Sequence, residues 1–108
     1  MNFNGQTALI TGAGRGIGKT IAVKLAESGL DIAIADMNPV SDDVRREIEE
    51  FGTKCLVFHL DVTDVESVDS VVKKIIDETG GIHILVNNAG ITGQPLYAHE
   101  TRTVVASH

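Results

Sequence analysis

The stretch TALITGAGRGIG, residues 7–18, joins a largely apolar run to a loop that contains four glycines. A short apolar run that ends in glycines is typical of a buried strand followed by a sharp turn. After the loop, apolar residues recur at helical spacing, namely Ile17, Ile21, Ala22, Leu25 and Ala26. Gly29 is then placed to end a helix. The stretch therefore predicts a strand, a glycine loop and a helix in that order.

The same alternation of short apolar runs and helical periods continues along the chain. We expect strands at residues 7–10, 31–36, 55–60 and 82–88. Ser41 is placed to cap the second helix, which Gly52 would end, and its apolar face comprises Val44, Ile48 and Phe51. Thr63 and Glu66 fit a capping box for a third helix. That helix would end at Gly80, and its apolar face comprises Val65, Val68, Val72, Ile75, Ile76 and Thr79.

The order of these elements predicts the sheet. Strands that alternate with helices pair in parallel through right-handed crossovers, and strands apolar on both faces need helices on both sides. The expected fold class is therefore α/β, the truncated first half of a doubly wound, Rossmann-like parallel sheet with strand order 3-2-1-4. Residues 1–96 would form this half-domain, with 97–108 as a divergent tail. The fourth strand would then be an exposed apolar edge beside an apolar patch, which favours self-association.

Composition narrows the function classes. The net charge of −6, from nine Lys and Arg against fifteen Asp and Glu, argues against binding to nucleic acid or to anionic membranes. Cys55 is the only cysteine, which excludes an internal disulfide and a multi-thiolate metal cluster, and we interpret it as a core residue. The four histidines lack metal-ligand spacing, and we interpret His59 and His83 as structural. Neither a secretion signal nor an apolar run of transmembrane length is present, so we expect a cytoplasmic protein.

The glycine loop has the properties of a phosphate site. Its bare N–H groups and the positive end of the following helix dipole favour an anion, and Arg15 and Lys19 add cations. The general pattern G-x-G-x-x-G fits in no frame. A P-loop ending is present at Gly18-Lys19-Thr20, but Ala13 stands where the first P-loop glycine belongs. The pattern T-G-x-x-x-G-x-G does fit, through Thr11, Gly12, Gly16 and Gly18.

Four short motifs in this order resemble the N-terminal, cofactor-binding half of short-chain dehydrogenases/reductases. They are TGAGRGIG at residues 11–18, Asp36 at the end of the second strand, DVT at residues 61–63 and NNAG at residues 87–90. The opening residues look most like oxoacyl-carrier-protein reductases and polyol dehydrogenases. The resemblance covers residues 1 to about 95.

The resemblance implies a nicotinamide dinucleotide partner. The diphosphate and nearby ribose would contact Gly12, Arg15, Gly16, Ile17 and Gly18. Asp36 would accept hydrogen bonds from the adenosine ribose hydroxyls, Asp61 would accept from the adenine amino group, and the Val62 backbone would address the ring. Asn88, Ala89 and Gly90 would pass beside the adenosine ribose, while Asn87 and Asn88 would tie the fourth strand toward Thr11. We favour NAD over NADP because Asp36 would repel a 2′-phosphate, although Arg15 would attract one.

The family's catalytic residues have no counterpart in the sequence. The family uses a Tyr with a Lys four residues later, assisted by a Ser and an Asn, to exchange the proton on the substrate oxygen. The only tyrosine here is Tyr97, four residues before Thr101, and no lysine follows Lys74. We therefore assign no catalytic residue and no metal.

The leading hypothesis is the dinucleotide-binding part of an oxidoreductase that transfers hydride between a nicotinamide cofactor and an alcohol or carbonyl, with little or no turnover alone. Three alternatives remain at this point. The chain could be a full enzyme that takes its proton donor from another chain or from a rearranged tail, or it could be a non-catalytic nucleotide-binding module that dimerises with full-length relatives. It could also be a small P-loop phosphotransferase.

Overall fold

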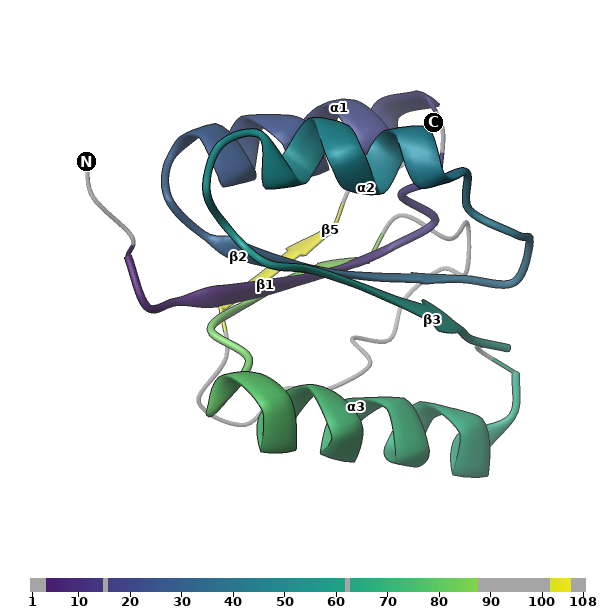
Figure 1. The fold of residues 1–108 in the computed structure, drawn as a ribbon. Coiled ribbons are helices and arrows are strands. Elements are labelled where there is room, and N and C mark those ends of the chain that lie inside the picture. The colour runs from purple at the N-terminus through teal and green to yellow at the C-terminus, as the bar shows by residue number, and fades with distance from the viewer. Residues whose placement is uncertain (1–3, 15, 62, 88–101, 106–108) are drawn as a thin grey trace.

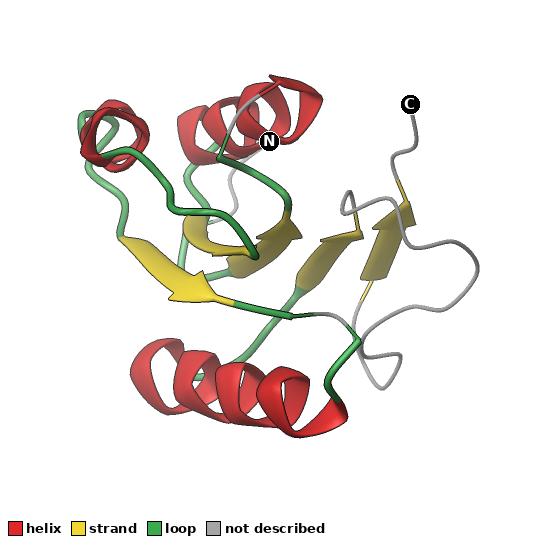
Figure 2. Ribbon diagram, turned by 90° about the vertical axis from the view of Figure 1, so that its right-hand side faces the viewer, coloured by secondary structure: helices red, strands yellow, loops and turns green. Residues whose placement is uncertain are grey.

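The computed structural model describes residues 4–14, 16–61, 63–87 and 102–105, and within them one parallel sheet lies between helices (Figure 1). Helices α1 and α2 cover one face of the sheet and α3 covers the other, which Figure 2 shows in a view turned by 90°. The elements in chain order are β1 (Thr7–Thr11), α1 (Gly16–Glu27), β2 (Asp31–Asp36), α2 (Asp42–Glu49), β3 (Cys55–His59), α3 (Val65–Thr79), β4 (Ile84–Asn87) and β5 (Arg102–Val105).

The strand order is β3-β2-β1-β4-β5, and every neighbouring pair is parallel. The predicted order 3-2-1-4 and the Rossmann-like class are therefore confirmed. Thr11, the last residue of β1, lies opposite Ala35 of β2 and Asn87 of β4. This register places the carboxyl ends of three strands at one edge of the sheet, where ligands bind in open α/β folds.

Strand β4 is not an edge strand, and this part of the sequence prediction is wrong. It pairs with β1 on one side and with β5 on the other, where Val86 lies opposite Val104. All four side chains of β4 are buried. A β-branched run favours an extended strand here, namely Thr103, Val104 and Val105. The backbone of β5 supplies the hydrogen-bonding partner that β4 would otherwise lack. Strand β4 therefore has no open edge through which the chain could self-associate, and self-association itself stays a prediction.

The core lies in two layers, one on each face of the sheet. Alternate residues of each strand point to opposite faces. Toward α1 and α2 lie Ala8, Ile10, Ile32 and Ile34, and toward α3 lie Leu9, Ala33, Ala35 and Leu85. Strand β3 differs because it is an edge strand of the sheet, and its Val57 is 41% exposed. The expectation of strands that are apolar on both faces is thus confirmed for β1 and β2, and only one face of β3 is well covered.

The helical faces were predicted less accurately than the strands. In α1 the buried residues are Gly18, Ala22 and Ala26, whereas Ile17 is 47% exposed. In α3 the buried residues are Val71, Val72 and Ile75, whereas Val65 and Ile76 are exposed. Phe51 follows α2 and is also exposed. Periodicity identifies an apolar stripe, but the neighbouring elements decide which part of the stripe they cover.

Asp64, and not Thr63, caps α3. The Asp64 carboxylate accepts hydrogen bonds from the Glu66 and Ser67 N–H groups at 3.0 and 3.4 Å. The Thr63 hydroxyl donates instead to Asp61 Oδ1 at 2.6 Å, so it is not used for the predicted capping box. The other predicted helix signals are confirmed: Ser41 Oγ caps α2, and Gly80 ends α3 with a left-handed φ of 91°. A carboxylate is at least as good an N-cap acceptor as a hydroxyl, which explains the shift by one residue.

Cys55 is a core residue, as predicted. Its side chain is 2% exposed, and burial together with the nearby Glu49 carboxylate raises the thiol pKa to about 11, against a smaller opposing influence of Arg45. A thiol with such a pKa is almost entirely protonated at neutral pH, so it is a poor nucleophile and metal ligand.

Replacing Asp64 by Ala should lower the free energy of unfolding by about 1 kcal/mol, because two N–H groups of the first turn lose their acceptor. Urea denaturation followed by circular dichroism measures this change. Asp69→Ala is the matched control, since Asp69 is an exposed residue inside the same helix. An equal loss in both variants would contradict the assignment of Asp64 as the cap.

Cys55 should react with a thiol reagent at pH 8 about a hundredfold more slowly in the folded protein than in urea, because a pKa near 11 instead of 9.0 reduces the thiolate by two powers of ten. The unfolded chain also releases its thiol proton first as the pH rises. The free energy of unfolding should therefore decline between pH 9 and about pH 11. This decline should be smaller in Cys55→Ala, and an identical pH dependence in both proteins would contradict it.

Candidate functional site

The candidate site lies at the carboxyl edge of β1, β2 and β4, where three sequence motifs meet. Thr11 ends β1, Asp36 ends β2 and Asn87 ends β4. The glycine loop begins directly after Thr11 and leads into α1 at Gly16. Parallel pairing alone is enough to bring these segments together, because the carboxyl ends of parallel strands share one edge.

Thr11 joins β1 to β4 through its side chain. The hydroxyl lies 3.2 Å from Asn87 Oδ1 and 3.5 Å from the Val86 carbonyl oxygen, and it can donate its proton to either. Both Thr11 and Asn87 are buried. The predicted tie between the fourth strand and Thr11 is therefore confirmed for Asn87, whereas Asn88 lies outside the described residues.

The glycine loop turns through two left-handed positions. Gly12 has a φ of 68° and Gly16 a φ of 64°, values that side-chain-bearing residues rarely adopt. The Gly12 N–H donates to the Ala35 carbonyl oxygen at 2.9 Å, which anchors the start of the loop on β2. Gly18 is buried in the first turn of α1. The predicted loop glycines Gly12, Gly16 and Gly18 thus form a tight turn that leads into a helix N-terminus.

The loop touches the carboxylate of Asp36. The Gly14 N–H donates to Asp36 Oδ2 at 3.3 Å, and the Asn38 N–H donates to Oδ1 at 2.9 Å. The loop and the acidic residue predicted to share a ligand are therefore in direct contact, although 22 residues separate them in sequence.

Gly14 was not among the predicted site residues. It occupies an unspecified position of the pattern T-G-x-x-x-G-x-G, so the pattern gave no reason to select it. A Cβ atom at Gly14 would lie only 3.1 Å from Asp36 Oδ2 and 3.4 Å from Val40 Cγ2. A fourth glycine in the loop together with an Asp at the end of β2 is the only sequence signal for this contact.

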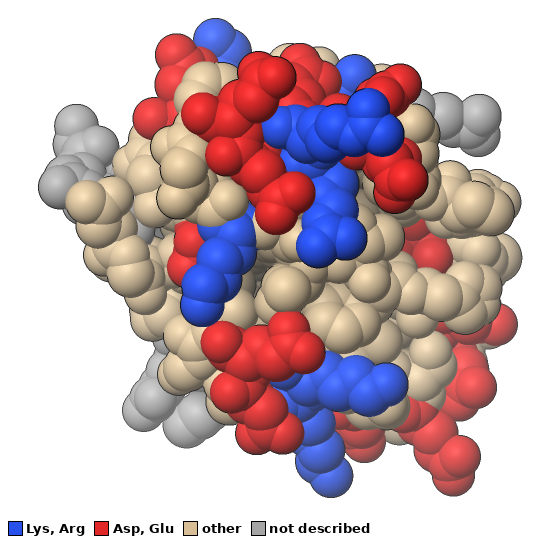
Figure 3. Space-filling model, viewed as in Figure 1, with Lys and Arg blue, Asp and Glu red and all other residues tan. Residues whose placement is uncertain are grey.

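Lys19 does not supply a free cation to the loop, contrary to expectation. Its ammonium group forms an ion pair with Glu47 of α2 at 3.2 Å. The Thr20 hydroxyl donates to the Gly16 carbonyl oxygen within α1. Both residues of the P-loop-like ending are thus engaged in helix contacts. In the view of Figure 3, which is that of Figure 1, acidic and basic side chains are interspersed over the surface of the molecule.

Asp61 follows β3 and forms a local turn with Thr63. Its Oδ1 accepts from both the Thr63 N–H and the Thr63 hydroxyl, at 3.0 and 2.6 Å. These two hydrogen bonds lower the pKa of the Asp61 carboxyl, with a smaller contribution from His59. The carboxylate is therefore charged at neutral pH and can serve as an acceptor.

Five of the predicted site residues lie outside the described residues, namely Arg15, Val62, Asn88, Ala89 and Gly90. Ile17 is in the first turn of α1, directly after the loop, and is 47% exposed.

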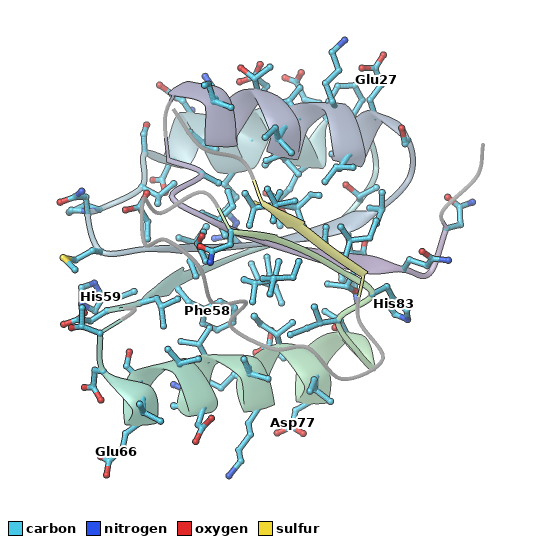
Figure 4. The ribbon with its side chains drawn as sticks, turned by 180° about the vertical axis from the view of Figure 1, so that it is seen from behind. Glu27, Phe58, His59, Glu66, Asp77 and His83 are labelled. Atoms are coloured by element: carbon cyan, nitrogen blue, oxygen red, sulfur yellow. The ribbon has the colours of Figure 1, made fainter. Side chains whose placement is uncertain are left out.

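Histidines do not form a metal centre in the part of the chain that the structure describes. His59 and His83 lie at opposite ends of the sheet (Figure 4). The His83 ring atom Nδ1 accepts from the Thr7 backbone N–H at 3.0 Å, and the His83 backbone N–H donates to the Thr7 carbonyl oxygen. These two hydrogen bonds confirm a structural role for His83. Across the described ranges, no three His, Cys, Asp or Glu residues are grouped so that they could hold a metal ion. Nor does any helix there combine the length and apolar character that crossing a membrane requires.

Comparison with known proteins gives one consistent result. The sequence matches the short chain dehydrogenase family over residues 6–106. It is 38% identical to (−)-trans-carveol dehydrogenase of Rhodococcus erythropolis, over 89% of this chain and 39% of that protein. It is 46% identical to a 3-oxoacyl-[acyl-carrier-protein] reductase of Vibrio cholerae, over 85% of this chain and 37% of that protein. The chain thus spans about two fifths of the length of these curated relatives.

Solved structures agree with the sequence matches. NAD⁺-bound xylitol dehydrogenase superimposes with a TM-score of 0.78 at 38% identity, over 86% of this chain and 36% of that one. Carveol dehydrogenase from Mycobacterium avium, in complex with NAD, gives a TM-score of 0.75 at 27% identity, over 86% of this chain and 38% of that one. The predicted likeness to oxoacyl-carrier-protein reductases and polyol dehydrogenases is confirmed.

Thr11→Val should lower the free energy of unfolding by about 1 kcal/mol, because the buried hydroxyl that joins β1 to β4 is lost while the side-chain shape is kept. Chemical denaturation measures the loss. Thr20→Val is the matched control, since that hydroxyl is exposed and bonds within its own helix, and its effect should be smaller. The role given to Thr11 fails if Thr20→Val costs as much.

Proposed function

The chain belongs to the short-chain dehydrogenase family, and on that premise we propose that its glycine loop and Asp36 bind NAD. Members of this family bind NAD or NADP. The observation that carries the proposal is the contact between Gly14 and Asp36, because it brings a loop suited to a diphosphate against a carboxylate suited to a ribose.

The residues of the loop fit a diphosphate. The left-handed Gly12 and Gly16 turn the backbone at the N-terminus of α1, where the helix dipole favours negative charge. In this proposal Gly12, Gly16, Ile17 and Gly18 present the backbone to the diphosphate, and Arg15 adds a cation. The net charge of −6 does not oppose this binding, because the field that matters is the local one at the helix N-terminus.

The adenosine part would lie along the carboxyl ends of the strands. Asp36 accepts from the ribose hydroxyls, and Asp61 accepts from the adenine amino group while the Val62 backbone addresses the ring. The low pKa of Asp61 supports its acceptor role, because the charged carboxylate is the form that accepts. The family resemblance assigns Asn88, Ala89 and Gly90 to positions beside the adenosine ribose.

Asp36 is the reason to favour NAD over NADP. The 2′-phosphate of NADP would replace a hydroxyl that the carboxylate can bind. Two unit negative charges 4 Å apart repel each other by about 4 kcal/mol at an effective dielectric constant of 20. Lys19 is paired with Glu47 of α2, which reduces the contribution that its charge could make against this repulsion.

Hydride transfer is the chemistry that the nicotinamide ring supplies when bound. For the whole protein we propose transfer between the cofactor and an alcohol or carbonyl substrate, as in the family. The proton on the substrate oxygen must be exchanged by a positioned acid or base, and the sequence contains no Tyr-x-x-x-Lys for that step. We therefore propose that this chain alone binds and orients the cofactor without turnover.

Calorimetric titration of the chain with NAD, NADP and ATP tests the proposal. We expect NAD to bind about tenfold or more tightly than NADP, since the repulsion at Asp36 is several times RT, and ATP to bind weakest because Lys19 and Thr20 are engaged elsewhere. Asp36→Ala should weaken NAD binding and reduce the preference for NAD over NADP, whereas Asp77→Ala, at an exposed position of α3, should change neither. Tighter binding of NADP or of ATP by the unaltered chain would overturn the proposal.

A further inference from the structure

We propose that Gly14 is a positioning residue that controls cofactor choice through Asp36. This inference rests on the proposed function, and it adds to the site a residue at an unspecified position of the loop pattern. Its basis is the hydrogen bond from the Gly14 N–H to Asp36 Oδ2, together with the narrow space between the two residues.

The sheet register explains why Gly14 reaches Asp36. Thr11 lies opposite Ala35, and the Gly12 N–H donates to the Ala35 carbonyl oxygen at 2.9 Å. The loop is thereby fastened to β2 one residue before Asp36. Gly14 follows two residues later and comes to lie over the Asp36 side chain, because the turn at Gly12 directs the backbone toward β2.

Two backbone N–H groups hold the carboxylate, one on each oxygen. Gly14 binds Oδ2 and Asn38 binds Oδ1, so the plane of the carboxylate is set by two partners that cannot rotate away. A carboxylate has about four acceptor sites, and these bonds use two of them. Each oxygen thus keeps acceptor capacity for one hydroxyl, which matches the two neighbouring hydroxyls of a ribose.

The missing side chain at position 14 matters for the same reason. A Cβ there would lie 3.1 Å from Asp36 Oδ2, closer than nine in ten real Cβ contacts, and 3.4 Å from Val40 Cγ2. Gly14 does not have a positive φ, unlike Gly12 and Gly16. An alanine at this position therefore introduces no backbone strain, and its effect reports the contact with Asp36.

The two cofactors should respond differently to an alanine. Displacing the carboxylate removes a charged acceptor from the ribose hydroxyls of NAD, which weakens NAD. The same displacement moves the negative charge away from the 2′-phosphate of NADP, which relieves repulsion. A general loosening of the loop, by contrast, would weaken both cofactors alike. The ratio of the two affinities is thus the decisive quantity.

The experiment is calorimetric titration of the 108-residue chain carrying Gly14→Ala with NAD and with NADP. We expect NAD to bind about tenfold more weakly, as for the loss of a hydrogen bond to a charged group, and NADP to change by less than about threefold. Gly81→Ala is the matched control, because it makes the same change at a glycine without positive φ far from Asp36 in the sequence and should leave both affinities unaltered.

A double-mutant cycle identifies the route of the effect. In an Asp36→Ala background the Gly14→Ala change should have almost no effect on NAD binding, because the partner of the new methyl group is gone. Equal weakening of NAD and NADP, or an undiminished loss in the Asp36→Ala background, would show that the methyl group obstructs the cofactor directly and would overturn the inference. Unaltered NAD and NADP affinities in Gly14→Ala would also overturn it, with the proposed function intact. Failure of the unaltered chain to bind either cofactor would instead refute the proposed function.

A measurement without cofactor tests the contact even if Gly14→Ala does not fold. In amide NMR spectra, Asp36→Ala should shift the Gly14 and Asn38 N–H resonances, since both donate to that carboxylate, and should leave the Gly81 resonance in place. An unshifted Gly14 resonance in folded Asp36→Ala would overturn the inference.

Discussion

The pairing of β1 with both β2 and β4 is the constraint on which the site depends. Because the pairing is parallel and in register, Thr11 lies between Ala35 and Asn87, and the loop that follows has to pass over the end of β2. The buried Thr11 hydroxyl and the Gly12 N–H reinforce the two sides of this arrangement. A shift of one residue would turn Asp36 to the other face of the sheet.

Backbone groups, more than side chains, build the site. The positive φ values of Gly12 and Gly16 allow the turn, and the N–H groups of Gly14 and Asn38 orient the carboxylate of Asp36. Backbone donors are suited to this task because they have no side-chain rotamers to lose. Lys19 is used for another purpose, because its ion pair with Glu47 joins α1 to α2.

The sheet extends further than the four strands that hydrophobic patterning predicted. Strand β5 comes from a segment that resembled a divergent tail, yet it pairs with β4 over its full length. Burial of all four β4 side chains follows the same trend, since an interior strand is covered on both faces. Strand β4 is therefore paired along both of its edges, in a chain that spans about two fifths of the length of its relatives.

The sequence by itself determined the order of the first seven elements, the bounds of β2, the Ser41 cap and the strand order 3-2-1-4, which follow from local preferences and from the few topologies that parallel strands allow. That the glycine loop and Asp36 share a ligand was implied by the family resemblance. Only the tertiary structure decided that Asp64 caps α3, that Ile17 and Val65 are exposed, that β5 closes the β4 edge and that Gly14 touches Asp36. Each of these depends on what lies across space from a residue. The Asp64 carboxylate caps α3 while the Thr63 hydroxyl bonds to Asp61. Gly14 contacts the Asp36 side chain, which is 22 residues away in the sequence.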